Sequence, residues 1–257
     1  MINVQNDGPI TVVEIDRPES RNAVDGPTAE ALRQAFLTFD ADDQQLIAVL
    51  TGAGGHFCAG ADLTALAGND ERALKIQPPP APGPLGCSRM RLTKPVIAAV
   101  EGYAVAGGLE LALWADLRVA AESAVFGVFC RRFGVPLIDL GAVRLPRLVG
   151  HSHAMDMILT GRPVDASEAQ MMGLANRVVA DGTARTAAVE LARTIASFPQ
   201  MTMRSDRQVA IEQWDLDDER WHAREFILGR NVLHSGEAAE GALRFVAGVG
   251  RHGQPVE

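Results

Sequence analysis

The hydrophobic positions of the chain form short apolar runs in the first half and helical repeats in the second. Apolar runs rich in β-branched residues and bounded by Gly, Pro or Asp predict buried strands. Such runs cover residues 10–15 (ITVVEI), 46–51 (LIAVLT), 96–100 (VIAAV) and 117–121 (LRVAA). Strands are therefore expected to crowd the first half of the molecule.

Helical spacing of apolar residues begins after Pro27 and runs to about residue 40. Beyond residue 142 the same spacing predicts helices over residues 143–149, 153–159, 167–172, 183–197, 202–213, 217–234 and 237–246. The pattern therefore predicts elements of both kinds, with strands in the first half of the chain and helices in the second. The sequence contains no exact internal repeat and no sharp change of composition that would mark an independent second domain.

The stretch over residues 96–116 organises these elements. A buried strand leads into Gly107 and Gly108, and an apolar helix follows. The first N–H groups of a helix are unpaired and lie at its positive end, so this turn is a candidate site for an oxygen anion. Glu110 lies in the first helical turn, where it is either a partner of the helix dipole or a working acid.

A glycine loop over residues 52–55 suggests a nucleotide site, but its pattern argues against one. Phe57 stands where GxGxxG requires its third glycine, and no Lys-Ser/Thr pair follows the loop as in a P-loop. Residues 68–86 include the run PPPAPGPLG, which predicts a surface loop because proline interrupts both sheets and helices. That loop is either a tolerated insertion or a lid.

The composition narrows the class of protein. At 257 residues with 47% hydrophobic side chains, the chain can bury the core of one large domain or two small ones. A net charge of −8 argues against nucleic-acid binding, which needs a basic face. No apolar stretch approaches the roughly 20 residues of a membrane span, and the N-terminus lacks a signal pattern. Cys58, Cys87 and Cys130 lack the spacing of metal ligands, so we expect neither disulfides nor a metal site. Free cysteines favour a reducing compartment, and we expect a cytoplasmic protein.

Three stretches, in this order and spacing, resemble the crotonase superfamily of enoyl-CoA hydratases and isomerases. They are residues 55–63 (GHFCAGADL), 100–112 (VEGYAVAGGLELA) and 144–150 (RLPRLVG). Matches around residues 17–23, 159–162 and 166–175 extend the resemblance over residues 10–180.

The resemblance implies an α/β fold, a crotonase-like spiral of repeated β-β-α units over residues 1–182 that carries the CoA site and the active site. It implies that residues 183–257 form a helical region that covers the site and builds a homotrimer, often paired into a hexamer. An acyl-CoA thioester is the implied substrate, with coenzyme A as part of it and no other cofactor.

The same resemblance assigns the site residues. Two backbone N–H groups, those of Ala61 and Gly107, are implied as the oxyanion hole that stabilises an enolate. Arg21 is the implied contact of a CoA phosphate, with an ordinary surface arginine as the alternative. The full implied CoA-binding set is Arg21, Ala23, Ala59, Asp62, Leu63 and Gly108.

The proton-transferring groups are less regular. Glu110 matches the first glutamate of the family's hydratases, whereas Cys130 stands where the second is expected. A thiol of ordinary pKa about 8.5 is a poor substitute for a carboxylate at neutral pH. Asp139 is a candidate second carboxylate, because isomerases and related members place an aspartate in this loop. The alternatives are that Asp139 caps the next helix and that Cys130 only packs.

We therefore expect a family enzyme that forms an enolate from an acyl-CoA thioester, with enoyl-CoA hydratase as the first label. An enoyl- or dienoyl-CoA isomerase using Glu110 with Asp139 is the alternative within enzymes. A non-catalytic acyl-CoA- or RNA-binding homologue is the alternative outside them.

Overall fold

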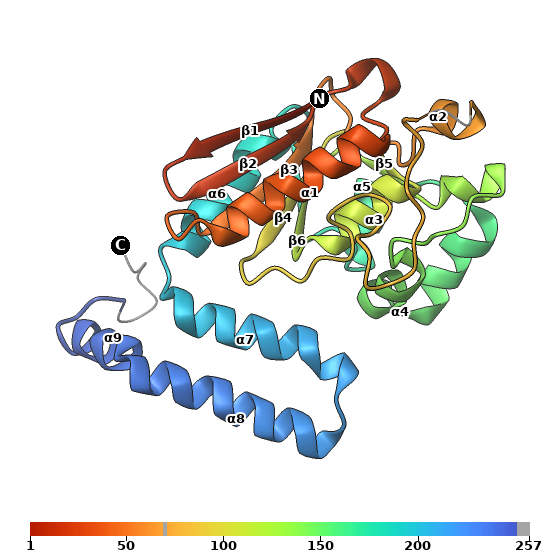
Figure 1. The fold of residues 1–257 in the computed structure, drawn as a ribbon. Helices are drawn as coiled ribbons and strands as arrows, with labels where there is room; N and C mark the ends of the chain where they lie inside the picture. The colour runs from red at the N-terminus through yellow and green to blue at the C-terminus, as the bar shows by residue number, and fades with distance from the viewer. Residues whose placement is uncertain (69–70, 251–257) are drawn as a thin grey trace. The chain divides into compact units, whose positions relative to one another are not determined.

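A computed structural model describes residues 1–68 and 71–250 and contains a six-stranded sheet (Figure 1). The strand order is β1 (Ile2–Asp7), β2 (Ile10–Ile15), β3 (Ile47–Gly52), β4 (Val96–Val100), β6 (Leu117–Ala121) and β9 (Arg177–Val179). β1 pairs antiparallel with β2, and every later neighbour is parallel. Four of these strands match the apolar runs of the sequence. β4 is buried at every position, as expected of a strand covered on both faces of a parallel sheet.

A second sheet has three short strands, β5 (Tyr103–Val105), β7 (Val125–Gly127) and β8 (Val164–Asp165). β4 of the large sheet continues into β5 of the small one and then into helix α3 (Gly107–Trp114). β6 and β7 repeat this path before the 3₁₀ turn η2 (Phe129–Phe133) and helix α4 (Gly141–Thr160). The chain thus contains the successive β-β-α turns that the family resemblance implies.

Helix α1 (Gly26–Ala41) lies along the large sheet (Figure 1). Its buried face includes Leu32 and Phe36, and the Phe36 ring meets Trp114 of α3 edge to face, with ring centroids 4.7 Å apart. Three further α-helices lie in the described residues between α1 and residue 197: the short α2 (Leu63–Ala67) and α5 (Ala166–Met171) and the longer α6 (Ala184–Ala196), in addition to α3 and α4. α4 bends at Gly150, where φ is 77°, so the predicted break between its two halves is confirmed.

Arg118 is a buried residue of β6, with 2% of its surface exposed. Its guanidinium donates to the carbonyls of Leu174 at 2.6 Å and Ala115 at 2.9 Å. Its backbone N–H donates to the Asn176 side chain at 2.8 Å, so one residue ties β6 to the segment that enters β9. Burial lowers the pKa of Arg118 to about 10.

The Pro-rich segment differs from its prediction at one end. Residues 78–80 are exposed, but residues 83–88 are buried, so a surface loop over the whole of residues 68–86 is wrong. Residues 69–70 of that prediction lie outside the described residues. The buried end is set against the loop that carries Asp139, because the Leu85 N–H donates to the Asp139 carboxylate at 3.1 Å.

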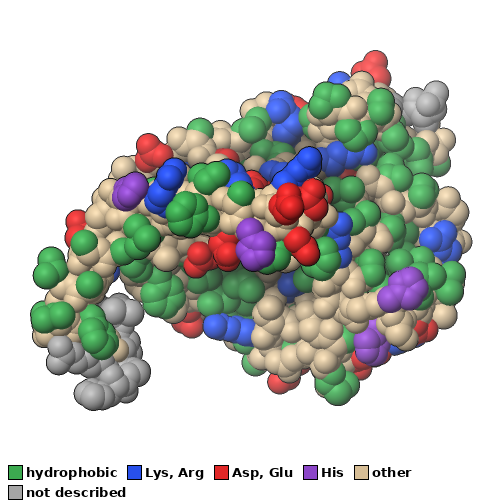
Figure 2. Space-filling model, turned by 90° about the horizontal axis from the view of Figure 1, so that it is seen from below, with side chains coloured by type: hydrophobic (Ala, Val, Ile, Leu, Met, Phe, Trp, Pro, Cys, Tyr) green, Lys and Arg blue, Asp and Glu red, His purple; other side chains and the backbone are tan. Residues whose placement is uncertain are grey.

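The chain divides into two compact units, Met1–Ala192 and Arg193–Glu257. In the second, helices α7 (Gln200–Glu212), α8 (Asp218–Ser235) and α9 (Glu237–Val246) pack on one another, and Arg224 of α8 pairs with Glu212 of α7 at 2.6 Å. Exposed apolar side chains line these helices (Figure 2), with Phe226, Leu233, Leu243 and Phe245 more than half exposed. The predicted division at residues 182/183 lies directly before α6, earlier in the chain than this boundary at residues 192/193. That the two parts have separate functions stays a prediction.

Within the described ranges, no helix is long and apolar enough to cross a membrane. The same residues hold no group of three His, Cys, Asp or Glu side chains that could bind a metal ion. The three cysteines are buried and free of disulfides.

Candidate active site

Two backbone N–H groups meet at the turn between β5 and α3. A Cβ atom built on Gly60 would lie 2.7 Å from the Gly107 nitrogen, and one built on Gly107 would lie 3.5 Å from the Ala61 nitrogen. Among the described residues, neither Ala61 nor Gly107 donates its N–H to an acceptor. The small residues therefore bring two unpaired backbone donors close together.

The turn before Gly107 is strained. Ala106 has φ 54° and ψ −125°, which a residue with a Cβ rarely adopts and which costs on the order of 1–3 kcal/mol. The Ala106 N–H donates to the Gly127 carbonyl of β7 at 2.9 Å and so holds the turn in place. The conformation makes Gly107 the first residue of α3, with its N–H outside the helical ladder.

Glu110 lies on the same helix with only 2% of its surface exposed. Its Oε1 accepts the N–H of Asp139 at 2.9 Å and that of Gly141 at 2.8 Å. Burial raises the pKa of Glu110 to about 7, against the opposing effect of the Gly141 N–H, and the Asp139 charge raises it further. Near neutral pH this carboxyl group can both accept and donate a proton.

Asp139 is 3% exposed and its Oδ1 accepts the Ser88 hydroxyl and the Leu85 N–H, the latter at 3.1 Å. Burial raises its pKa, while the Ser88 hydrogen bond opposes that rise. The capping alternative is wrong, because Leu140, with φ 72°, precedes α4 and no side chain caps the helix. Asp139 and Glu110 instead line the same cavity.

Cys130 also lines this cavity and is 6% exposed. Burial raises the pKa of its thiol, and the charge of Glu110 raises it further. The thiol is therefore protonated at neutral pH and unsuited to act as a base.

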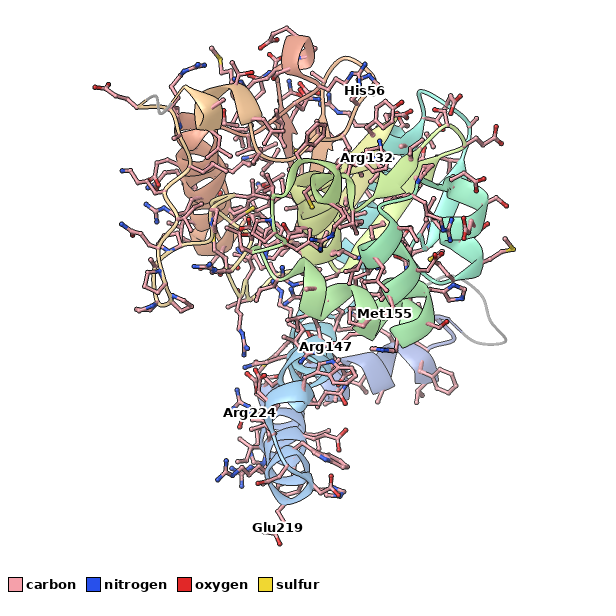
Figure 3. The ribbon with its side chains drawn as sticks, turned by 90° about the vertical axis from the view of Figure 1, so that its right-hand side faces the viewer. His56, Arg132, Arg147, Met155, Glu219 and Arg224 are labelled. Atoms are coloured by element: carbon pink, nitrogen blue, oxygen red, sulfur yellow. The ribbon has the colours of Figure 1, made fainter. Side chains whose placement is uncertain are left out.

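The cavity measures about 300 Å³, and apart from Glu110, Asp139 and Cys130 its walls are apolar side chains and small residues. Leu74 and Ile76 contribute from the segment after α2, and Phe129 and Phe133 from η2. Arg132, labelled in Figure 3, lies with its guanidinium 3.8 Å from the centroid of the Phe129 ring and donates to the Gly161 carbonyl at 3.1 Å. The arginine fixes this wall and does not contact Asp139 in any described hydrogen bond.

The predicted CoA-binding residues fall into two groups. Ala59 and Leu63 line the cavity, whereas Gly108 is buried where a Cβ would lie 1.9 Å from the Cys58 carbonyl oxygen. Asp62 caps α2 through the Thr64 N–H at 3.0 Å and pairs with Arg17 at 2.9 Å. These contacts show that Gly108 and Asp62 stabilise the local fold. A contact of either residue with CoA stays a prediction.

Arg21 lies in a left-handed turn with φ 51°, and its carbonyl accepts the Ala59 N–H at 3.0 Å. Its guanidinium lies 5.3 Å from the centroid of the Tyr103 ring, which His56 (Figure 3) also contacts. Ala23 is 7% exposed, and its carbonyl accepts the Arg17 guanidinium. The backbone of Arg21 thus lies directly beside the loop that carries Ala59.

Sequence reasoning missed Ser88 and the apolar walls Leu74 and Ile76. Ser88 is a neutral residue with no motif around it, and only the folded chain brings it to Asp139. The alternation in residues 73–77 (ALKIQ) was a signal for the walls, because Leu74 and Ile76 face one side of an extended segment.

Comparisons with known proteins show the family to which the chain belongs. A family model described as enoyl-CoA hydratase/isomerase matches residues 5–247. The chain is 37% identical over 253 residues to enoyl-CoA hydratase EchA19 of Mycobacterium tuberculosis, covering 94% of this chain and 92% of that protein. It is 35% identical to a carnitinyl-CoA dehydratase of Salmonella typhi, covering 95% and 94% of the two chains.

Solved structures give the same result. The enoyl-CoA hydratase EchA1 of Mycobacterium marinum superimposes with a TM-score of 0.90 at 32% identity, covering 100% of this chain and 97% of that one. An enoyl-CoA hydratase of Mycobacterium tuberculosis H37Rv gives a TM-score of 0.90 at 35% identity, covering 96% and 95%. The predicted α/β crotonase-like fold is confirmed.

Proposed function

The chain belongs to the enoyl-CoA hydratase/isomerase family, and on this premise we propose that it is an enoyl-CoA hydratase-like enzyme that forms an enolate from an acyl-CoA thioester. The observation that carries the proposal is the pair of unpaired N–H groups at Ala61 and Gly107 on the cavity that also holds Glu110. Fixed donors aimed at one oxygen stabilise the negative charge that an enolate places there.

The carboxyl groups supply the proton transfers. In hydration the water oxygen bonds to C3 of the enoyl group while one water proton passes to a carboxylate. The electrons of the double bond move toward the thioester oxygen. The Ala61 and Gly107 N–H groups donate hydrogen bonds to that oxygen. The enolate then takes a proton at C2 from a carboxylic acid, so that H and OH have been added across the double bond.

Glu110 is the group proposed for the obligatory proton transfer. Its pKa of about 7 keeps both of its forms populated near neutral pH, and two backbone N–H groups fix its Oε1. The second oxygen, Oε2, accepts no hydrogen bond from the described residues and lies available to substrate or water. Asp139 is proposed as its partner.

Isomerisation is the second candidate reaction, and Cys130 favours it. Moving a double bond requires removal of a proton from one carbon and its return to another, which one carboxyl group can do without activating water. Since the raised pKa of Cys130 leaves a protonated thiol where a second glutamate is expected, Glu110 and Asp139 are the ionisable pair that remains.

The substrate is proposed to sit with its thioester at the N–H pair and its acyl group against the apolar walls. Arg21, Ala23, Ala59, Asp62, Leu63 and Gly108 are proposed to meet the CoA portion. Leu63 and Ala59 line the cavity, which supports this direction of entry.

We also propose that the protein works as a homotrimer or a dimer of trimers in the cytoplasm. The exposed apolar side chains of α8 and α9 support assembly, because a monomer rarely leaves many large apolar groups in water. Three free cysteines support a reducing compartment. Light scattering at micromolar concentration tests assembly, and a strict monomer contradicts it.

A paired assay tests the reaction. Conjugated 2-enoyl-CoA thioesters of increasing chain length and their 3-enoyl isomers are each incubated with enzyme, and products are separated by mass spectrometry. A product heavier by one water identifies hydration, and a rearranged product of unchanged mass identifies isomerisation. Absence of both reactions across the series, with wild-type protein that is folded, contradicts the proposal.

A further inference from the structure

The buried end of the Pro-rich segment contacts Asp139 directly. Ser88 is fully buried, and its hydroxyl donates to Oδ1 of Asp139, 51 positions further along the chain. The Leu85 N–H donates to the same oxygen at 3.1 Å. Both donors therefore hold one oxygen of the carboxylate.

The main chains of the same two residues are joined by Arg144. Its guanidinium donates to the Asp139 carbonyl at 3.0 Å and to the Ser88 carbonyl at 2.8 Å. Side chain and backbone thus connect Ser88 with Asp139 at the same place, which fixes the loop before α4 against the segment before β4.

Gly83 closes the segment over this contact. A Cβ atom built on Gly83 would lie 2.0 Å from the Ser88 hydroxyl oxygen and 2.9 Å from Oδ1 of Asp139. Arg89 then links the exposed part of the segment to the same loop, donating to the carbonyl of Gln77 at 2.9 Å and to that of Ile138 at 3.4 Å. The Pro-rich segment is therefore built into the site.

The remaining oxygen of Asp139, Oδ2, accepts no hydrogen bond from the described residues, and the side chain lines the cavity with Glu110. We propose that Ser88 is a positioning residue: its hydroxyl holds Oδ1 of Asp139 so that the carboxyl group is fixed in place and Oδ2 is presented to the reacting group. The inference rests on the proposed function, in which Asp139 partners Glu110.

Charged and titratable groups face Asp139 from each neighbouring element. Glu110 lies on α3, Arg144 on α4, and Arg89 and Cys87 on the segment before β4. The arginines and the Ser88 hydroxyl favour the ionised carboxylate, and burial and Glu110 disfavour it. Because the Ser88 hydrogen bond lowers the pKa of Asp139, its removal must raise that pKa further above the ordinary value.

Four proteins test the inference: wild type, Ser88→Ala, Asp139→Asn and the double variant. The matched control is Thr51→Val, which removes a buried hydroxyl bonded at 3.1 Å to the Ala99 carbonyl in the sheet. The profile of kcat/KM against pH is measured for each with an acyl-CoA that wild type turns over. Carboxyl-carbon NMR, assigned by the signal lost in Asp139→Asn, follows the titration of Asp139 without any need for turnover.

We expect Ser88→Ala to move the acid limb of the profile and the Asp139 titration to higher pH by about one unit, a roughly tenfold change in proton affinity. kcat falls while KM changes little, and Thr51→Val moves neither the limb nor the titration. In the Asp139→Asn background, Ser88→Ala then changes the rate less than about twofold. Ser88→Cys keeps a side chain of similar shape with a weaker donor and should give a smaller shift in the same direction. It replaces Ser88→Ala if the alanine variant does not fold.

An Asp139 titration unchanged by Ser88→Ala and Ser88→Cys overturns the inference. Losses from Ser88→Ala and Asp139→Asn that multiply in the double variant also overturn it, because two residues acting through one carboxylate must not add fully. A shifted titration in a protein that turns over no acyl-CoA rejects the proposed function instead, and leaves only the pairing of Ser88 with Asp139.

Discussion

Replacing Glu110 with glutamine should weaken catalysis and strengthen the fold at the same time. Burial raises the pKa of Glu110 from 4.5 to about 7, so the folded protein holds its ionised form at a cost. The change is worth roughly 3 kcal/mol, since each pKa unit corresponds to about 1.4 kcal/mol. Glutamine has the same shape and carries no charge at any pH.

The sign follows from the two pKa values. A carboxyl group whose pKa is higher in the folded state favours folding below its unfolded pKa, and loses that contribution as pH rises through the folded value. Glu110→Gln should therefore gain the least stability relative to wild type below pH 4.5, gain more as pH rises from 4.5 to about 7, and keep the full gain at higher pH. The glutamine oxygen can still accept the N–H groups of Asp139 and Gly141, but an uncharged acceptor binds them less tightly. A net gain of about 1–3 kcal/mol remains, or several degrees in Tm for a chain of this size.

Thermal unfolding followed by circular dichroism at pH 5 and pH 8 measures the change, and kcat is measured on the same preparations. Turnover should fall by about 10²–10⁴-fold, the typical worth of general acid–base catalysis. The exposed Glu122 supplies the control, since Glu122→Gln should change neither kcat nor the pH dependence of Tm. Equal destabilisation by Glu110→Gln at both pH values would refute the reasoning, because it would mean that the folded site does not disfavour the charge.

Three further substitutions test separate parts of the structure. Gly60→Ala should lower kcat/KM at least about tenfold, because its Cβ would lie 2.7 Å from the Gly107 nitrogen; Gly8→Ala, also at positive φ but with open space around it, should leave steady-state kinetics unchanged. Arg118→Met should lower the free energy of unfolding by roughly 3–5 kcal/mol in urea titrations, because it leaves buried carbonyls without a donor; a loss below about 1 kcal/mol contradicts the role given to this residue. Cys130→Ala should keep kcat within about threefold of wild type, since the thiol is protonated and only packs; a loss as large as that of Glu110→Gln would show that the thiol takes part in the reaction.

The large sheet was predictable where burial selects apolar side chains. β2, β3, β4 and β6 are continuous apolar runs because both faces of a parallel sheet are covered. β1 escaped prediction since it is an edge strand with polar, exposed side chains that only pairing with β2 holds in place. The strands β8 and β9 are too short for any periodicity to be visible.

The site was predictable where a motif fixes the backbone, and unpredictable where tertiary contacts do. The GG turn before Glu110 indicated both an exposed N–H and a carboxylate beside it, and the structure brings them to one cavity. The environment of Asp139 could not be predicted from the sequence. The residue that follows it, Leu140, has a left-handed backbone conformation, and its hydrogen-bond donor, Ser88, comes from a distant segment. A capping role remained an open alternative until that loop was seen.

The central claim is that this cavity stabilises an enolate and that Glu110 carries the proton to or from its C2 atom. Exchange of the α-hydrogens of a saturated acyl-CoA with deuterated solvent, followed by mass spectrometry, measures that step without requiring the natural substrate. Wild type should incorporate deuterium at C2, and Glu110→Gln should do so at least about a hundredfold more slowly. Exchange by Glu110→Gln at the wild-type rate, or no exchange by wild type with acyl-CoA thioesters that it binds, would contradict the account.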